Sequence, residues 1–151
     1  MPNDVVASAM RAHHASMSRE VNRLTEAVWS APADWGSARD QLVHYLTTEV
    51  LPHARAEEVT VYTAGRQFKT LVGLVWSMVY EHEVIGTLTD QLAQATEWRG
   101  AADLASKLAQ LFLVHAEKED RFIIAELEPS GDVDLGAVLG DMHKALAGDL
   151  P

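Results

Sequence analysis

The sequence contains no cysteine among its 151 residues, and this absence removes several kinds of chemistry at once. Disulfide bonds, iron–sulfur clusters, thiolate zinc sites and cysteine nucleophiles are all excluded. Basic residues are also scarce, because 12 Lys and Arg stand against 22 Asp and Glu, which gives a formal net charge of −10. A protein that binds nucleic-acid phosphates needs a basic surface, so we expect no nucleic-acid partner.

Long hydrophobic runs are missing as well. The longest one, residues 71–80, is too short to cross a bilayer and contains Gly73 and Ser77. The N-terminus lacks the basic and then apolar stretches of a secretion signal. We therefore expect a cytoplasmic protein with no membrane association. The length suffices for one domain with a sizeable core and is short for two, so residues 1–151 are expected to form one domain.

Apolar residues recur at three- and four-residue steps along four long segments, at about residues 3–30, 37–65, 67–96 and 101–128. This spacing predicts amphipathic α-helices, and no segment shows the alternation of a strand. Four such helices with short connections favour an all-α, up-down-up-down four-helix bundle over about residues 3–128. An apolar stripe at about residues 132–148 predicts a short fifth helix. Pro52 predicts a kink or break near residue 50.

Two of the seven histidines have a carboxylate four residues further along the chain. His53 is followed by Glu57 and His115 by Glu119, and residues four apart share one face of a helix. A chain with this many acids gives about one such pair by chance, so the two pairs alone are a weak signal.

The position of the histidines relative to the apolar stripes strengthens the signal. His53, His82 and His115 each lie a whole number of turns from apolar residues of their own segment, so all three should point into the core. In the first segment, His13 and His14 flank the stripe on either side. Every predicted helix of the bundle therefore directs at least one imidazole inwards.

Taken singly, each of these residues reads as a core histidine that is hydrogen-bonded to a neighbour. Together they would bury four imidazoles and two carboxylates in an apolar bundle, which is costly without a compensating cation. Nitrogen and carboxylate oxygen without sulfur suit iron, manganese or zinc. His44 should face away from the core and His143 lies in the tail, so both are interpreted as surface or packing residues.

The order His, His-x-x-x-Glu, His, His-x-x-x-Glu in four helices resembles the hemerythrin-like, or HHE cation-binding, family over about residues 4–127. The resemblance implies two iron ions, oxo- or hydroxo-bridged, with Glu57 and Glu119 as bridging carboxylates. His13 and Asp120 remain alternatives to His14 and Glu119. The metal ligands that the resemblance implies are His14, His53, Glu57, His82, His115 and Glu119.

One position departs from the oxygen-carrying members of this family, which have a further histidine where this chain has Met78. One iron should therefore have fewer protein ligands and an open position, and reversible oxygen carriage is less favoured. Tyr62 could fill the vacancy, but nine residues separate it from His53, so we expect it to point half a turn away. The neighbouring charged residues Glu58 and Lys118 are expected on solvated helix faces.

The resemblance implies a non-haem diiron protein that binds or decomposes a small oxidant: dioxygen, hydrogen peroxide or nitric oxide. No catalytic residue distinct from the metal ligands is expected, and catalase-like turnover is left open. The alternative is an iron- or oxygen-responsive sensor without turnover, acting on a partner protein or as a homodimer. A helical bundle without metal is the third interpretation.

Overall fold

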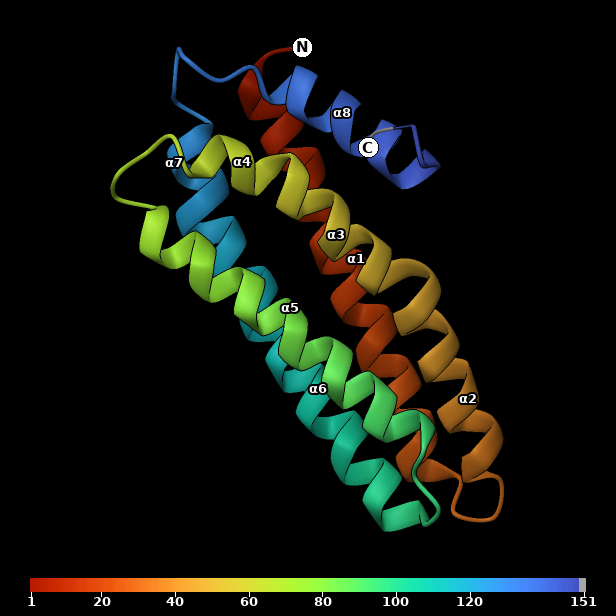
Figure 1. The fold of residues 1–151 in the computed structure, drawn as a ribbon. Helices are drawn as coiled ribbons and strands as arrows, with labels where there is room; N and C mark the ends of the chain where they lie inside the picture. The colour runs from red at the N-terminus through yellow and green to blue at the C-terminus, as the bar shows by residue number, and fades with distance from the viewer. Residues whose placement is uncertain (150–151) are drawn as a thin grey trace.

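A computed structural model describes residues 1–149, which are almost entirely helical and contain no strand (Figure 1). The predicted all-α bundle with a short C-terminal helix is confirmed. Two π-helical turns, η1 and η2, interrupt the α-helices. The elements are α1 (Asn3–Ser30), α2 (Trp35–Tyr45), η1 (Leu46–Val50), α3 (Leu51–Val59), α4 (Val61–Gly65), α5 (Val72–Ala93), α6 (Trp98–Lys118), η2 (Glu119–Ile124), α7 (Ala125–Leu127) and α8 (Leu135–Ala147).

These elements form four rods that run side by side with alternating direction (Figure 1). The first rod is α1, the second runs from α2 to α4, the third is α5 and the fourth runs from α6 to α7. Helix α1 packs on α2 and α6, and α5 packs on α6. Helix α8 crosses one end of the bundle, where it contacts α1, α3 and α4.

The core consists of two apolar clusters, one toward each end of the rods. Along α1, Met10 belongs to the cluster near α8 and Met17 to the other cluster, and His14 lies between them. His82 has the same place on α5, between Met78 and Ile85. The buried polar residues therefore form a layer between two apolar halves, and the structure has to compensate the cost of burying that layer.

The helix is disrupted near residue 50, as Pro52 predicted: a π-helical turn lies directly before α3, the helix that contains Pro52. Residues 46–50 form η1, and the N–H of Leu51 donates to the carbonyl of Leu46, five residues back. The wider turn accommodates the proline at the start of α3, where its missing N–H removes little. The second π-helical turn begins at Glu119 and contains no proline, so no local sequence signal predicted it. Such turns are frequent at functional sites.

Helix α8 is attached to the start of α1. The side chain of Asn3 donates to the carbonyl of Val133 at 2.8 Å and accepts from the N–H of Leu135 at 3.0 Å. Asp134 caps the helix by accepting from the N–H of Ala137. The helix lies within the predicted tail segment.

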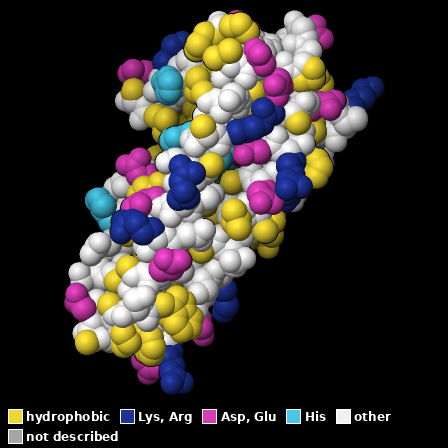
Figure 2. Space-filling view, turned by 180° about the vertical axis from the view of Figure 1, so that it is seen from behind, with side chains coloured by type: hydrophobic (Ala, Val, Ile, Leu, Met, Phe, Trp, Pro, Cys, Tyr) yellow, Lys and Arg dark blue, Asp and Glu magenta, His cyan; other side chains and the backbone are white. Residues whose placement is uncertain are grey.

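Two features of the structure relate to the expectations about nucleic-acid and membrane partners: the distribution of surface charge and the apolar character of the helices. On the face shown in Figure 2, the Lys and Arg side chains are interspersed with Asp and Glu and form no continuous patch. Within residues 1–149, no helix combines the length and the apolar character that a membrane span would need.

Candidate metal centre

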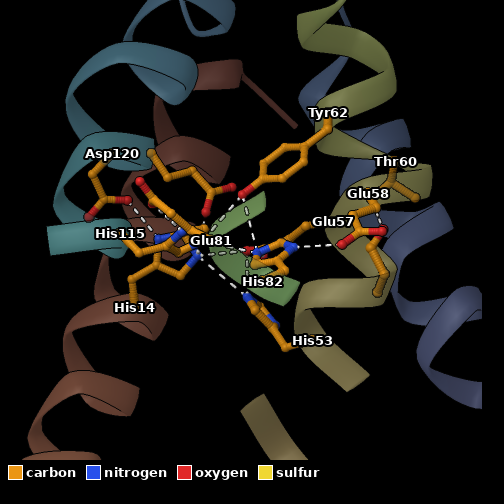
Figure 3. A network of polar contacts seen from close by, with 12 residues as sticks. His14, His53, Glu57, Glu58, Thr60, Tyr62, Glu81, His82, His115 and Asp120 are labelled. Atoms are coloured by element: carbon orange, nitrogen blue, oxygen red, sulfur yellow. Dashed lines mark hydrogen bonds and ion pairs between the residues drawn. The ribbon is translucent and has the colours of Figure 1, made fainter. Parts of the chain in front are cut away.

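The polar layer between the two halves of the core contains all six residues that the family resemblance implied as ligands. Figure 3 labels all of them except Glu119. They come from all four rods, and none is more than 8% exposed. His13 is exposed on α1, and the structure therefore places His14 inside the bundle and His13 outside it. His44 and His143 are exposed, as predicted.

One half of the layer joins α1 and α3. The Nε2 atoms of His14 and His53 lie 3.4 Å apart, and Oε1 of Glu57 lies 3.2 Å from the first and 2.8 Å from the second. Ligand atoms at about 2.1 Å from a metal ion lie about 3 Å from one another. These three atoms therefore have the spacing of a metal-binding group.

The other half joins α3, α5 and α6. Oε2 of Glu57 lies 3.6 Å from Nε2 of His82, and the Nε2 atoms of His82 and His115 are 3.0 Å apart. These three residues form a second group that could hold a metal ion. Glu57 contributes one carboxylate oxygen to each group, as a bridging carboxylate does.

Three carboxylates outside the layer orient the imidazoles. Each accepts a hydrogen bond from an Nδ1 atom, and this leaves the lone pair of Nε2 facing the centre. The pairs are His14 with Asp120 at 2.7 Å, His82 with Glu58 at 2.8 Å and His115 with Glu81 at 2.9 Å. Without a cation or a proton between them, Nε2 lone pairs at such separations repel each other.

Two sequence expectations about charged residues are wrong. Glu58 is half-buried against His82, and Lys118 pairs with Glu81, so neither is simply a solvated surface charge. Asp120, the alternative to Glu119, lies on the outer side of His14. A carboxylate at position 58 or 81 gives no periodic signal, because its role depends on a histidine in another helix.

Glu119 has a buried carboxylate oxygen without a partner. Oε2 lies 3.9 Å from Nε2 of His14, and Oε1 has no hydrogen-bond partner among the described residues. The side chain is 1% exposed. Leaving such an atom unsatisfied costs about 1–3 kcal/mol, and a cation between Glu119 and the imidazoles would compensate that cost. The residues present therefore fit a bound metal pair.

Tyr62 is a member of the site, contrary to the prediction from its spacing. Its hydroxyl lies 3.4 Å from Nε2 of His82 and 3.3 Å from Nε2 of His115, and its ring stacks on His82. The helix breaks at Thr60, where φ is −120° and ψ is −83°, so the register of His53 does not extend beyond it. The β-branched run at residues 59–61 was the available signal, since such residues weaken a helix.

The pKa values describe how protons occupy the centre without a cation. Burial lowers the pKa of His14, but hydrogen bonds to Asp120 and Glu57 outweigh it and raise this pKa to about 11. Burial would raise the pKa of Glu57, yet the neighbouring imidazoles, His53 foremost, hold it well below its usual range. Burial and the charge of Glu57 raise the pKa of Glu119 well above its usual range. A metal ion would therefore displace protons from this centre.

Among the comparisons with known proteins, only the comparison with protein families gave a match. Neither the curated proteins nor the solved structures gave a significant match. The family described as Hemerythrin HHE cation binding domain matches residues 5–127, which include every residue of the polar layer. Because this match spans most of the sequence, the chain belongs to the hemerythrin HHE cation-binding domain family.

Proposed function

We propose that the chain is a non-haem diiron protein that binds or decomposes a small oxidant at the polar layer. The observation that carries the proposal is Glu57, whose two oxygens face two separate pairs of imidazoles. Nitrogen and oxygen donors without sulfur suit iron. Bound as a pair, iron ions supply ferrous–ferric redox chemistry to a small ligand.

The candidate ligands divide between two positions. His14 and His53 with one oxygen of Glu57 would hold one ion, and Glu119 stands beside them. The other oxygen of Glu57 with His82 and His115 would hold the second ion, and the hydroxyl of Tyr62 lies within reach of that position. Tyr62 thus occupies the side on which Met78 was expected to leave a vacancy.

The rest of the site orients donors and excludes water. Asp120, Glu58 and Glu81 keep the Nε2 lone pairs directed at the centre. The apolar clusters above and below the layer keep it dry, and Met78 itself is fully buried. A dry setting strengthens the electrostatic interactions of the carboxylates with a bound cation.

The test is metal analysis of purified protein with a matched histidine pair. After loading with ferrous iron, the wild type should retain about two ions per chain and show a near-ultraviolet oxo-to-iron absorption. His82→Ala should lose the bound iron and the absorption band. His44→Ala should keep the iron and the band, because His44 is exposed. A folded wild type that retains no iron would refute the proposal.

A second candidate is a sensor in which occupancy rather than turnover matters. The centre takes its residues from all four rods, so a bound metal pair would stabilise the whole bundle. Peroxide consumption by the iron-loaded protein favours the first candidate. No consumption, together with strong iron-dependent protection from proteolysis, favours the sensor.

A further inference from the structure

A pocket of about 230 Å³ lies between α1, α3 and α8, on the outer side of the polar layer. Four of the seven histidines of the chain line it: His14 and His53, which are buried, and His13 and His143, which are exposed. The other lining residues are alanine, leucine and methionine, so the imidazoles are the only side-chain nitrogen or oxygen donors of this pocket. Figure 2 shows histidine and apolar side chains in the hollow where the end of the molecule meets the body of the bundle.

The two exposed histidines of the pocket are not members of the centre. Among the described residues, the groups whose donor atoms have the spacing of a metal site include neither His13 nor His143. The ring centroid of His13 nevertheless lies 4.9 Å from that of His53, which is a member. His143 belongs to α8, which spans Leu135–Ala147 and lies beyond the family match. These two residues therefore suit brief contact with a cation on its way to the centre.

His53 differs from the other three histidines of the centre in how its ring is held. Nδ1 of each of the other imidazoles donates to a carboxylate. The polar contacts of His53 within residues 1–149 are all made by Nε2, so no second hydrogen bond fixes its ring. The ring also borders the pocket. His53 is therefore the candidate ligand that can turn toward the pocket and back at the lowest cost.

Filling the centre requires a ligand to move. The space enclosed by the candidate ligands is about 10 Å³, close to the volume that one water probe needs. A hydrated cation has to exchange its waters for protein donors before it fits there. Imidazole nitrogens bind divalent transition metals, so a series of imidazoles from the surface to the centre allows this exchange in steps.

The other approaches to the centre offer no such series. A groove of about 330 Å³ reaches the opposite side of His14 and is lined by Arg19, Glu117 and Asp120. Its carboxylates attract cations, but Nδ1 of His14 donates to Asp120 there, so the lone pair of this imidazole faces away from the groove. The hydroxyl of Tyr62 lies over the His82–His115 half. The groove is the rival route, and an experiment has to distinguish it from the pocket.

We propose that divalent metal ions enter the centre through the pocket between α1, α3 and α8, where His143 and His13 bind the incoming ion and pass it to His53. This inference rests on the proposed function, because it concerns how that centre is filled. His13 and His143 then set the rate of filling and leave the final metal content unchanged, since they lie outside both donor groups.

The test follows the uptake of cobalt(II) by metal-free, full-length protein in a stopped-flow spectrometer, through the visible absorption of cobalt bound to nitrogen and oxygen donors. The double variant His13→Ala/His143→Ala should fill about tenfold or more slowly than the wild type and reach the same cobalt content. Two controls, His44→Ala at an exposed histidine elsewhere and Glu117→Gln at the rival groove, should fill within about twofold of the wild-type rate. His13→Asp/His143→Asp should fill within about threefold of that rate, because a carboxylate also binds cobalt.

Several results would overturn the entrance alone. These are equal rates in the wild type and the double alanine variant, slow filling of the aspartate variant, and slowing of Glu117→Gln as large as that of the double alanine variant. A lower final cobalt content in the double alanine variant would also overturn it, because His13 and His143 would then belong to a resident site. Wild-type protein that retains neither cobalt nor iron at equilibrium would defeat the proposed function, and the entrance with it.

Discussion

Glu119→Met should change the stability of the metal-free and the metal-loaded protein in opposite directions. In the metal-free state the substitution removes a fully buried carboxylate whose Oε1 has no partner and whose Oε2 is 3.9 Å from His14, beyond hydrogen-bond distance. Methionine has a similar length and favours a helix. Removing one unsatisfied buried atom should raise the free energy of unfolding by about 1–3 kcal/mol.

In the metal-loaded state the same change removes a candidate ligand. Each hundredfold loss of iron affinity lowers the stabilisation by bound metal by about 2.7 kcal/mol at saturating metal. Urea unfolding of both states, with chelator or with ferrous iron, measures the two effects separately. Thermal unfolding should agree, with a rise of about 2–10 °C for the metal-free variant.

Glu117→Met is the matched control, because Glu117 is exposed two residues earlier in the chain. It should change the free energy of unfolding by less than about 0.5 kcal/mol in either state. If Glu119→Met instead destabilises the metal-free protein by several kcal/mol and iron makes no difference, Glu119 is a structural residue. The unpaired oxygen of Glu119 would then no longer indicate a cation at the centre.

Three further predictions concern the rest of the centre. The folded state raises the pKa of His14 to about 11 from 6.5, so its stabilising effect is complete below pH 6.5 and is lost as the pH rises. Urea unfolding of metal-free protein should show the free energy of unfolding falling as the pH rises above 7, with His14 contributing about 1.4 kcal/mol per pH unit, and His14→Gln should reduce this slope. Tyr62→Phe should retain iron, and it should lose any visible phenolate-to-iron absorption of the ferric protein. That loss would identify Tyr62 as a ligand, and an unchanged spectrum would exclude it. Asp120→Asn should weaken iron binding about 10–100-fold by calorimetry, whereas Asp103→Asn, at an exposed position, should not.

Helical periodicity was enough to predict the fold and the inward direction of His53, His82 and His115. For His82 and His115 it worked because each lies in the same uninterrupted helix as the apolar residues that define its face. His53 lies in α3, beyond the π-helical turn η1, and is buried as predicted although the turn separates it from the apolar residues of α2. The disruption at Pro52 was also predictable, because a proline inside a helix has one local steric consequence. These are properties that the chain encodes within a few turns.

The residues that sequence reasoning missed depend on contacts between helices or on a break in register. Glu58 and Glu81 matter because His82 and His115 approach them from other rods. The side chain of Tyr62 was predicted to point away from the centre, because the helical spacing from His53 was extrapolated past Thr60. The backbone leaves the helix at Thr60. Residue spacing along a single helix predicts neither contacts with other helices nor a break in the helix.

The position of Tyr62 also changes where the open side of the centre should lie. The sequence placed the vacancy at Met78, on the third helix, by comparison with oxygen carriers. Met78 is fully buried in the apolar cluster, and the hydroxyl of Tyr62 faces the imidazoles of that half. The accessible side is instead the one bounded by His14 and His53, where the pocket beneath α8 begins. Helix α8, which bounds this pocket, lies outside the family match, so the resemblance alone could not have shown on which side the centre is accessible.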